Sequence, residues 1–399
     1  MKKGSPVKET EFAELELGRE FLFSRTAAKW CRYPSNVIPS WIAEMDFLPP
    51  EVLQDSVMKL VSKRDYGYPR RPLMPAERQI GDAFAHRMGE HFGWKIEETS
   101  IQAVTDLLQG TIAAILAFSE AGEHIAVHTP CYSPFREAIE EAGRKIVEIP
   151  MLETDAGFFP DMDELRNAPA DTRMFILCNP QNPTGRVFTC AELEEIAAIA
   201  EARDMIIFSD EVHADFVYDS GKHIPIASLG ERVAARTMTA NSPGKSFNIA
   251  GLRCGVIHFG TPELLARFRA RIPRLLLGRP SAISVDAAVA AWTEGQPWLD
   301  RIVALLDRNR QIVFKALSQR MPQLKAFMPE ASFLAWIDCR ALGWQQPAAT
   351  VFLEKARIAF SSGESFCARH DGFVRLNFAT SEEVLREKLE RMEKLVNAH

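Results

Sequence analysis

The sequence has no long hydrophobic run and no surplus of positive charge. Its apolar stretches fall well short of the roughly 20 residues that a membrane-spanning helix needs. The N-terminus MKKGSPVKET lacks the apolar core of a signal peptide. With 47 Lys and Arg against 53 Asp and Glu, the chain lacks the excess of cations that binding to a nucleic-acid backbone requires. We therefore expect neither a membrane nor a nucleic acid as a partner.

Cysteine pairs and metal-ligand spacings are missing as well. The seven cysteines are an odd number, none belongs to a C-x-x-C pair, and several lie inside apolar runs. This pattern is typical of thiols that serve as small hydrophobic side chains in a reducing compartment. The nine histidines are scattered along the chain. The sequence thus predicts a cytoplasmic protein without a metal site.

What is present fits a globular chain of two lobes, since 399 residues with 47% hydrophobic side chains exceed one ordinary domain. From about residue 100 to 260, short runs rich in Val, Ile and Phe alternate with helical patterns such as 191–204. This alternation predicts an α/β domain with a mostly parallel sheet covered by helices. After about residue 285, long helical patterns and a few apolar runs indicate a smaller α+β domain. We predict an N-terminal segment that joins the small domain (1–50), a large domain (51–285) and a small domain (286–399).

Polar residues follow several of the predicted strands. In a parallel sheet the ligand binds beyond the carboxyl ends of the strands, so residues at these positions are expected to share one site. The four candidates are Tyr132, Asn182, Asp210 and Lys245.

Three stretches carry a family resemblance: CNPQNPTGRVF (178–188), SDEVHADF (209–216) and SPGKSFNIAGLRCG (242–255). Taken alone, NPTG would also suit a loop that caps a helix. The order and spacing of all three resemble fold-type I pyridoxal-phosphate enzymes of the aminotransferase class I/II superfamily, over essentially the whole chain. The resemblance implies a PLP-transferase fold, pyridoxal 5′-phosphate as cofactor and a small-molecule amino-acid substrate.

The resemblance also implies roles for three catalytic residues. Lys245 would hold the cofactor aldehyde as an imine and later move the Cα proton of the substrate. Asp210 would keep the ring nitrogen protonated, and its alternative role is a helix N-cap. Tyr132 would stack on the ring, or else be a core tyrosine.

Three further residues are expected beside the ring and the substrate. Asn182 would donate to the ring oxygen, and His213 would lie near the same oxygen unless it is a structural histidine. Arg375 matches the arginine that clamps the substrate α-carboxylate through two bonds. Its alternative role is an internal salt bridge.

The cofactor phosphate is expected to meet a hydroxyl, a guanidinium and a helix N-terminus. Ser242 and Arg253 supply the first two groups, and the backbone amides of Leu107 and Leu108 supply the third. Asp106 stands where relatives usually carry a small residue. An acid beside a phosphate is unfavourable unless its side chain turns away to cap the helix.

The segments WIAEMDF (41–47), YGYP (66–69) and SFLAWID (332–338), with His213, resemble the cystathionine β-lyase branch of the MalY/PatB type. This resemblance implies α,β-elimination of L-cystathionine or another L-cysteine S-conjugate to thiol, pyruvate and ammonia. An aminotransferase of the same fold and a low-turnover PLP-binding regulatory protein are the alternatives. The chain departs from this branch at Glu44, Gln181 and Phe333, and the last two substitutions are expected to alter the pocket beside the cofactor.

Tyr66 resembles a tyrosine that reaches the phosphate of the neighbouring subunit. The resemblance therefore implies a homodimer with active sites at the interface. The alternative is that Tyr66 and Tyr68 pack within a turn.

Overall fold

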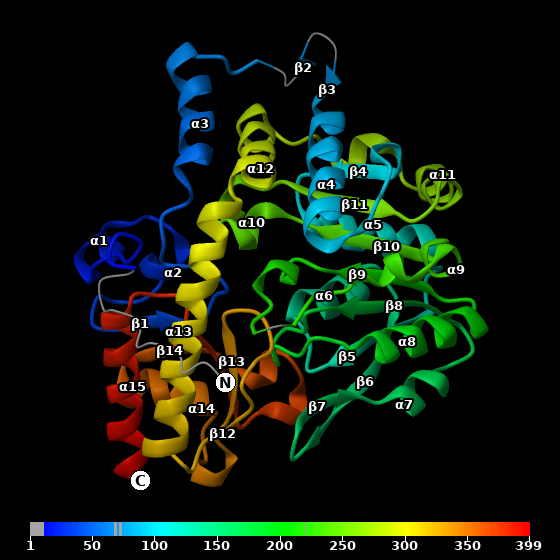
Figure 1. Ribbon diagram of the computed structural model, residues 1–399. Coiled ribbons are helices and arrows are strands. Elements are labelled where there is room, and N and C mark those ends of the chain that lie inside the picture. Colours follow the sequence, from blue (N-terminus) through cyan, green and yellow to red (C-terminus); the bar gives the residue numbers. More distant parts are fainter. Residues whose placement is uncertain (1–11, 68–69, 72–73, 220) are drawn as a thin grey trace, which may run out of the picture.

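An eight-stranded sheet forms the centre of the larger lobe in the computed structural model (Figure 1), which describes residues 12–67, 70–71, 74–219 and 221–399. Its strand order is β4-β11-β10-β9-β8-β5-β6-β7. Six strands run the same way, because only β7 and β11 pair antiparallel to their neighbours. This confirms the predicted, mostly parallel sheet. The strands are β4 (Ile101–Val104), β5 (His124–Thr129), β6 (Lys145–Thr154), β7 (Gly157–Pro160), β8 (Thr172–Cys178), β9 (Ile206–Asp210), β10 (Thr237–Asn241) and β11 (Gly255–Phe259).

Both faces of this sheet are buried, as the continuous apolar runs in its strands require. Successive side chains of β8 point to opposite faces, so Ile176 joins one core cluster while Phe175 and Leu177 join another. The helices of this lobe are α4 (Ala76–Phe92), α5 (Leu107–Phe118), α6 (Ser133–Glu141), α7 (Met162–Arg166), α8 (Cys190–Ala202), α9 (Glu231–Ala234), α10 (Pro243–Ser246), α11 (Pro262–Arg271) and α12 (Ala282–Glu294).

The helical pattern over 191–204 corresponds to α8. Thr189 and Glu192 form a reciprocal capping box at its start, which satisfies amides that the first turn leaves without partners. Its apolar residues recur every three to four positions, and Leu193 and Ile196 are fully buried. The helix therefore forms where its cap and its apolar face coincide.

A second sheet has the order β1-β14-β15-β13-β12. Its first strand comes from the N-terminal part of the chain and pairs parallel to β14. The strands are β1 (Ile38–Ser40), β12 (Lys325–Ala326), β13 (Leu334–Asp338), β14 (Ile358–Ser362) and β15 (Phe373–Asn377). The neighbouring helices are α13 (Gln296–Arg320), α14 (Ala348–Val351) and α15 (Glu382–Asn397).

Residues 41–47, here called the strap, follow β1 and contact both lobes. On the small-lobe side, the Asn377 amide donates to the carbonyls of Ile42 and Glu44, at 2.7 Å each. On the other side, the Asn248 side chain bonds to the backbone of Met45 and Phe47. The strap is thus fixed between Asn377 on β15 and the loop that follows α10.

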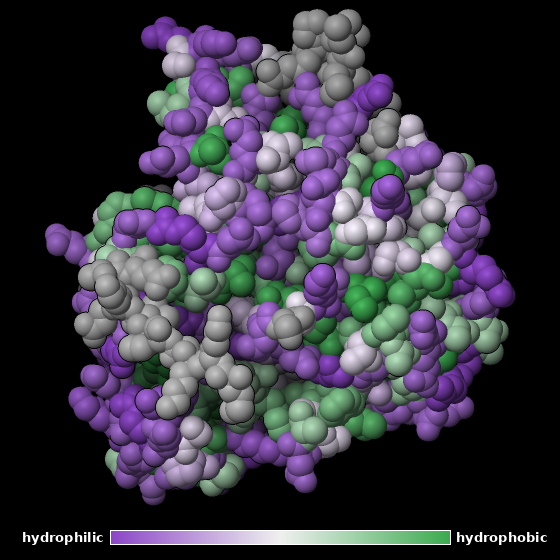
Figure 2. Space-filling view, in the orientation of Figure 1, coloured by the Kyte–Doolittle hydropathy of each residue, from purple (hydrophilic) through white to green (hydrophobic). Residues whose placement is uncertain are grey.

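The remaining elements are α1 (Arg19–Ser24), α2 (Ala28–Cys31), α3 (Glu51–Lys63) and a two-stranded ribbon of β2 (Arg70–Arg71) and β3 (Met74–Pro75). Helix α3 projects at the top of the molecule in Figure 1. Hydrophilic colour covers most of the surface around α3 and around α15 on the face seen in Figure 2. No helix within the described ranges has both the length and the hydropathy that crossing a bilayer demands.

Candidate active site

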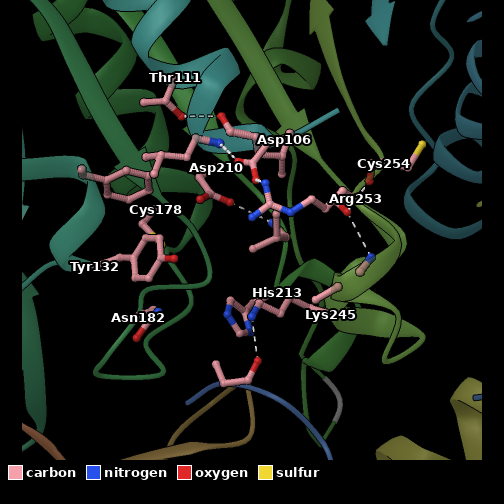
Figure 3. Close-up of a pocket in the computed structure, with 18 of the residues that line it drawn as sticks. Asp106, Thr111, Tyr132, Cys178, Asn182, Asp210, His213, Lys245, Arg253 and Cys254 are labelled. Carbon is pink, nitrogen blue, oxygen red and sulfur yellow. Dashed lines mark hydrogen bonds and ion pairs between the residues drawn. The ribbon is translucent and has the colours of Figure 1, made fainter. Parts of the chain in front are cut away.

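A pocket lies at the carboxyl ends of β5, β8, β9 and β10 (Figure 3). It collects nine of the eleven residues that the sequence assigns to catalysis, cofactor binding or carboxylate binding, and Tyr66 and Arg375 are the two of these that do not line it. The nine are Leu107, Leu108, Tyr132, Asn182, Asp210, His213, Ser242, Lys245 and Arg253.

Lys245 lies on the short helix α10, directly after β10. Ser242 caps this helix by accepting a hydrogen bond from the Gly244 amide at 3.0 Å. The Lys245 ammonium donates to the carbonyl of Ala43 in the strap at 2.6 Å. Removal from bulk water, aided by the positive charge of Arg375, lowers the pKa of Lys245 to about 8. The neutral amine is therefore far more accessible near neutral pH than in an exposed lysine, although the ammonium still predominates at pH 7.

Asp210 ends β9, the strand between β8 and β10. One of its oxygens accepts a hydrogen bond from the Val212 amide at 3.1 Å. The low-dielectric surroundings raise the pKa of Asp210 to about 6, because desolvation disfavours the carboxylate. A cation placed against Asp210 would stabilise its ionised form and lower this pKa.

His213 is buried beside Asp210 and Lys245. Burial, followed by the charges of Lys245 and Arg375, lowers the pKa of His213 to about 3, so its imidazole is neutral at physiological pH. Its Nδ1 lies 3.1 Å from the hydroxyl of Ser332. That contact fixes the ring orientation and leaves the other ring nitrogen for the pocket.

Arg375 on β15 lies next to the pocket rather than in its lining. It donates to the Asn182 side-chain oxygen at 2.9 Å, to the Trp41 carbonyl at 3.0 Å and to the Ser361 hydroxyl at 3.2 Å. Burial lowers its pKa to about 10, and its Nε has no hydrogen-bond partner. No ion pair joins Arg375 to an acidic side chain in the described part of the chain. A buried guanidinium with only neutral acceptors fits an anionic ligand.

The N-terminus of α5 forms the floor of a cup made of Asp106, Leu107, Leu108, Ser242 and Arg253, all of which line the pocket. Close packing holds α5 in place, since a Cβ on Gly255 would lie 2.7 Å from the Leu107 side chain. Asp106 caps α5, as the sequence suggested, and accepts from the Leu108 amide at 2.8 Å. Its other oxygen pairs with Arg253 at 2.9 Å. The Ser242 hydroxyl donates to the Cys254 carbonyl at 2.7 Å.

The two tyrosines predicted at the site lie in different places. Tyr132 precedes α6, is 39% exposed and meets Phe135 edge-on at 5.5 Å between ring centroids. Tyr66 follows α3, is 65% exposed and does not line the pocket. Tyr68 and Pro69 lie outside the described residues.

The sequence led us to expect that Gln181 and Phe333 alter the pocket. In the structure neither residue lines it. The Gln181 amide bonds to the Pro130 carbonyl at 2.6 Å, and its oxygen accepts from Thr184. Phe333 packs against His213 with 5.7 Å between ring centroids. Both side chains therefore act behind the pocket wall.

Sequence reasoning missed several lining residues. Thr111 had a usable signal, since it lies one helical turn after Leu107. Ala43 had none, because it contributes a backbone carbonyl. The described residues contain no group of side chains able to hold a metal ion, and all seven cysteines are free thiols. The missed lining residues also include Thr105, Phe135, Cys178, Val212, Gly244, Ala250 and Cys254.

A family model of aminotransferase class I and II matches residues 67–392, and the chain belongs to this family. Cystathionine β-lyase PatB of Bacillus subtilis (strain 168) is 31% identical over 361 residues, covering 90% of this chain and 92% of PatB. The crystal structure of a protein named OvoB is 34% identical with a TM-score of 0.89, covering 97% of this chain and 99% of OvoB. Cystalysin from Treponema denticola, whose crystal structure contains pyridoxal 5′-phosphate, is 28% identical with a TM-score of 0.89, covering 96% and 98%.

Proposed function

We propose that the chain is a pyridoxal-phosphate-dependent carbon–sulfur β-lyase that cleaves an L-cysteine S-conjugate such as L-cystathionine to a thiol, pyruvate and ammonia. The observation that carries this proposal is the near full-length similarity to a cystathionine β-lyase. The proposal is supported by a pocket in which an amine, an acid and an aromatic ring converge at the carboxyl ends of strands of one sheet.

The residues of the pocket fit this cofactor. Lys245 offers an amine with a lowered pKa of about 8 for the aldehyde. Asp210 has a raised pKa of about 6 and gains from a protonated ring nitrogen beside it. The side-chain oxygen of Asn182 accepts a hydrogen bond from Arg375, which leaves the amide hydrogens of Asn182 free to donate to the ring oxygen. The α5 N-terminus and Arg253 offer donors to the phosphate.

Arg375 binds the α-carboxylate of the substrate. Its guanidinium exchanges the neutral oxygens of Trp41 and Ser361 for a carboxylate, a stronger, charge-assisted partner with matching two-pronged geometry. This contact orients the Cα–H bond of the substrate toward Lys245 and excludes water from the guanidinium.

Lys245 moves the proton. When bound, pyridoxal phosphate supplies an electron sink that stabilises negative charge at Cα. The neutral Nζ of Lys245 takes the Cα proton, and the electron pair left on Cα forms a Cα–Cβ double bond as sulfur leaves Cβ with the C–S bonding pair. The proton held on Nζ can then pass to the departing thiolate. Water then hydrolyses the released enamine to pyruvate and ammonia. Asp210 holds the proton on the ring nitrogen throughout, while the neutral imidazole of His213 adds no opposing charge.

Product analysis tests this proposal. The loaded protein is incubated with L-cystathionine and other S-substituted cysteines, with and without an added keto acid, and Lys245→Ala serves as the inactive control. Thiol, pyruvate and ammonia in equal amounts without the keto acid are expected. Turnover that requires the keto acid and releases no thiol would contradict a lyase.

The second candidate is an aminotransferase, which the family match over residues 67–392 favours. The groups that bind the α-carboxylate and move the Cα proton serve both reactions equally. The two differ only in the fate of the charge at Cα, so the same experiment separates them.

We also propose a cytoplasmic homodimer in which Tyr66 reaches the site of the partner copy. The high exposure of Tyr66 supports this arrangement, and Met58 and Val61 on α3 are likewise 47% and 37% exposed. The absence of any disulfide among the seven cysteines is consistent with a reducing compartment. We keep the division into residues 1–50, 51–285 and 286–399 as part of the proposal.

A further inference from the structure

The cup at the N-terminus of α5 already holds an anion that belongs to the chain itself. Asp106 places one carboxylate oxygen 2.8 Å from the Leu108 amide and the other 2.9 Å from Arg253 Nη1. These are two of the donors that the cofactor phosphate is proposed to use. A third, the Ser242 hydroxyl, is engaged with the Cys254 carbonyl. Most of the phosphate donors thus have internal acceptors.

Local stability explains why the carboxylate lies there. Aspartate is a preferred N-cap residue, and the partial positive charge of the helix N-terminus favours an acid at this position. The ion pair between Asp106 and Arg253 is nevertheless open to water, since the Asp106 side chain is 32% exposed and the Arg253 side chain 70%. Exposed pairs are weak, so a phosphate dianion can displace the Asp106 carboxylate from Arg253. Within one cup, however, the two anions repel each other.

We propose that Asp106 is an internal competitor of the cofactor phosphate and sets the affinity of this chain for pyridoxal phosphate. This inference rests on the proposed function, because it takes the pocket to be the cofactor site. The carboxylate occupies the donors of the ligand-free cup and must be moved or tolerated when the phosphate enters. A neutral N-cap in its place would keep the bond to the Leu108 amide, leave Arg253 free for the ligand and remove the negative charge that repels the phosphate.

The test compares cofactor binding by the ligand-free wild type and by Asp106→Asn. Asparagine keeps the N-cap without the charge. We expect the Kd for pyridoxal phosphate to fall on the order of fivefold, which corresponds to the energy of a weak exposed ion pair. The Kd for pyridoxal, which lacks the phosphate, should not change. Titration of cofactor absorbance and quenching of tryptophan fluorescence measure both constants without reference to activity.

The chain offers a matched control in Asp161, the N-cap of α7, whose side chain accepts from the Glu164 amide at 3.0 Å. Asp161→Asn makes the same chemical change away from the pocket and should leave the Kd unaltered. If Asp106→Asn folds poorly, Asp106→Ser supplies another neutral cap. As a second readout, inorganic phosphate should stabilise the ligand-free Asp106 variant against heat at lower concentrations than it stabilises the wild type.

The outcomes separate the two claims. An unchanged or weaker affinity for pyridoxal phosphate in both Asp106 variants overturns the inference and makes Asp106 a residue that positions Arg253. An equal change in the affinity for pyridoxal also overturns it, because the effect would not act through the phosphate. A wild type that binds no pyridoxal phosphate at all refutes the proposed function itself.

Discussion

Arg375 is a buried cation without an acidic partner among the described residues, and this makes it suited to bind an anionic group. Arg375 is 5% exposed, and its guanidinium donates only to neutral oxygens and lies over the Phe366 ring at 4.8 Å from the centroid. Burying such a charge is unfavourable without an anion, which is why we propose the substrate carboxylate as its partner. Lysine keeps the charge at this position but cannot form the planar fork.

We predict that Arg375→Lys lowers kcat/KM for L-cystathionine by about 100-fold, chiefly through loss of the two-pronged contact. Steady-state kinetics measure this effect. Arg340→Lys is the matched control, since Arg340 is 52% exposed and pairs with Asp338 at the surface. A wild-type kcat/KM in Arg375→Lys would remove this residue from carboxylate binding.

The raised pKa of Asp210, about 6 in the ligand-free protein, has a consequence for stability. In an unfolded chain an aspartate titrates near 3.9, so between about pH 4 and pH 6 the folded state binds more protons. The contribution of Asp210 to stability is therefore full below this window and is lost as the pH rises through 6.

We accordingly predict that Asp210→Asn raises the melting temperature of the ligand-free protein by about 2–4 °C at pH 7 and by less at pH 5. The same variant should bind pyridoxal phosphate more weakly, because it cannot pair with the ring nitrogen. Thermal melts at the two pH values, with and without cofactor, check both effects. A gain in melting temperature that is larger at pH 5 than at pH 7 would show that the pKa of Asp210 is not raised in the folded protein.

At the scale of elements, the strap depends on Asn248. This residue has φ 57°, a left-handed conformation that asparagine tolerates better than most residues. Its side chain accepts from the Met45 amide at 3.1 Å and donates to the carbonyls of Met45 and Phe47 at 2.9 and 2.7 Å. One side chain thus fixes the segment whose Ala43 carbonyl contacts Lys245.

We predict that Asn248→Gly, which keeps the left-handed backbone, speeds proteolysis within the strap and costs about 1–3 kcal/mol through the lost bonds. Asn248→Ala should cost about 1 kcal/mol more, because alanine disfavours this conformation. Limited proteolysis and denaturant unfolding measure the two effects. Asn397→Ala, which removes one bond near the C-terminus, should change neither, and equal stability of the Gly and Ala variants would argue against backbone strain.

At the same scale, some structural features could be predicted from the sequence and others could not. The buried strands, α8 and the N-cap at Asp106 follow from side-chain patterns, and the structure confirms the α/β fold. The position of the strap against Lys245 could not be predicted, because it depends on the Ala43 carbonyl, and every residue carries a carbonyl. The pairing of Asp106 with Arg253 was hidden for another reason. It joins side chains far apart in sequence whose approach is set by the packing of α5 against β11.

At the scale of the whole molecule, the proposed exchange of Tyr66 between subunits can be tested by complementation. Lys245→Ala and Tyr66→Ala proteins are each expected to be impaired. If Tyr66 acts in trans, a mixed dimer contains one site with both residues intact, so a reassociated equimolar mixture should recover roughly a quarter of wild-type activity. Activity assays after reassociation, with sedimentation to verify dimers, measure this recovery. No recovery in verified mixed dimers would place Tyr66 in its own subunit's site or in neither.

The residues that make contacts at and beside the pocket are far apart along the chain. Lys245 meets Ala43 across 202 positions, and Arg375 meets Asn182 across 193. Contacts of such separation form late in folding, after loop-closure entropy has been overcome. A refolding chain should therefore regain most of its helical circular dichroism before it can capture the cofactor. The rate at which cofactor absorbance returns would then report the rate at which the strap and the lobes dock, which is the last step of folding.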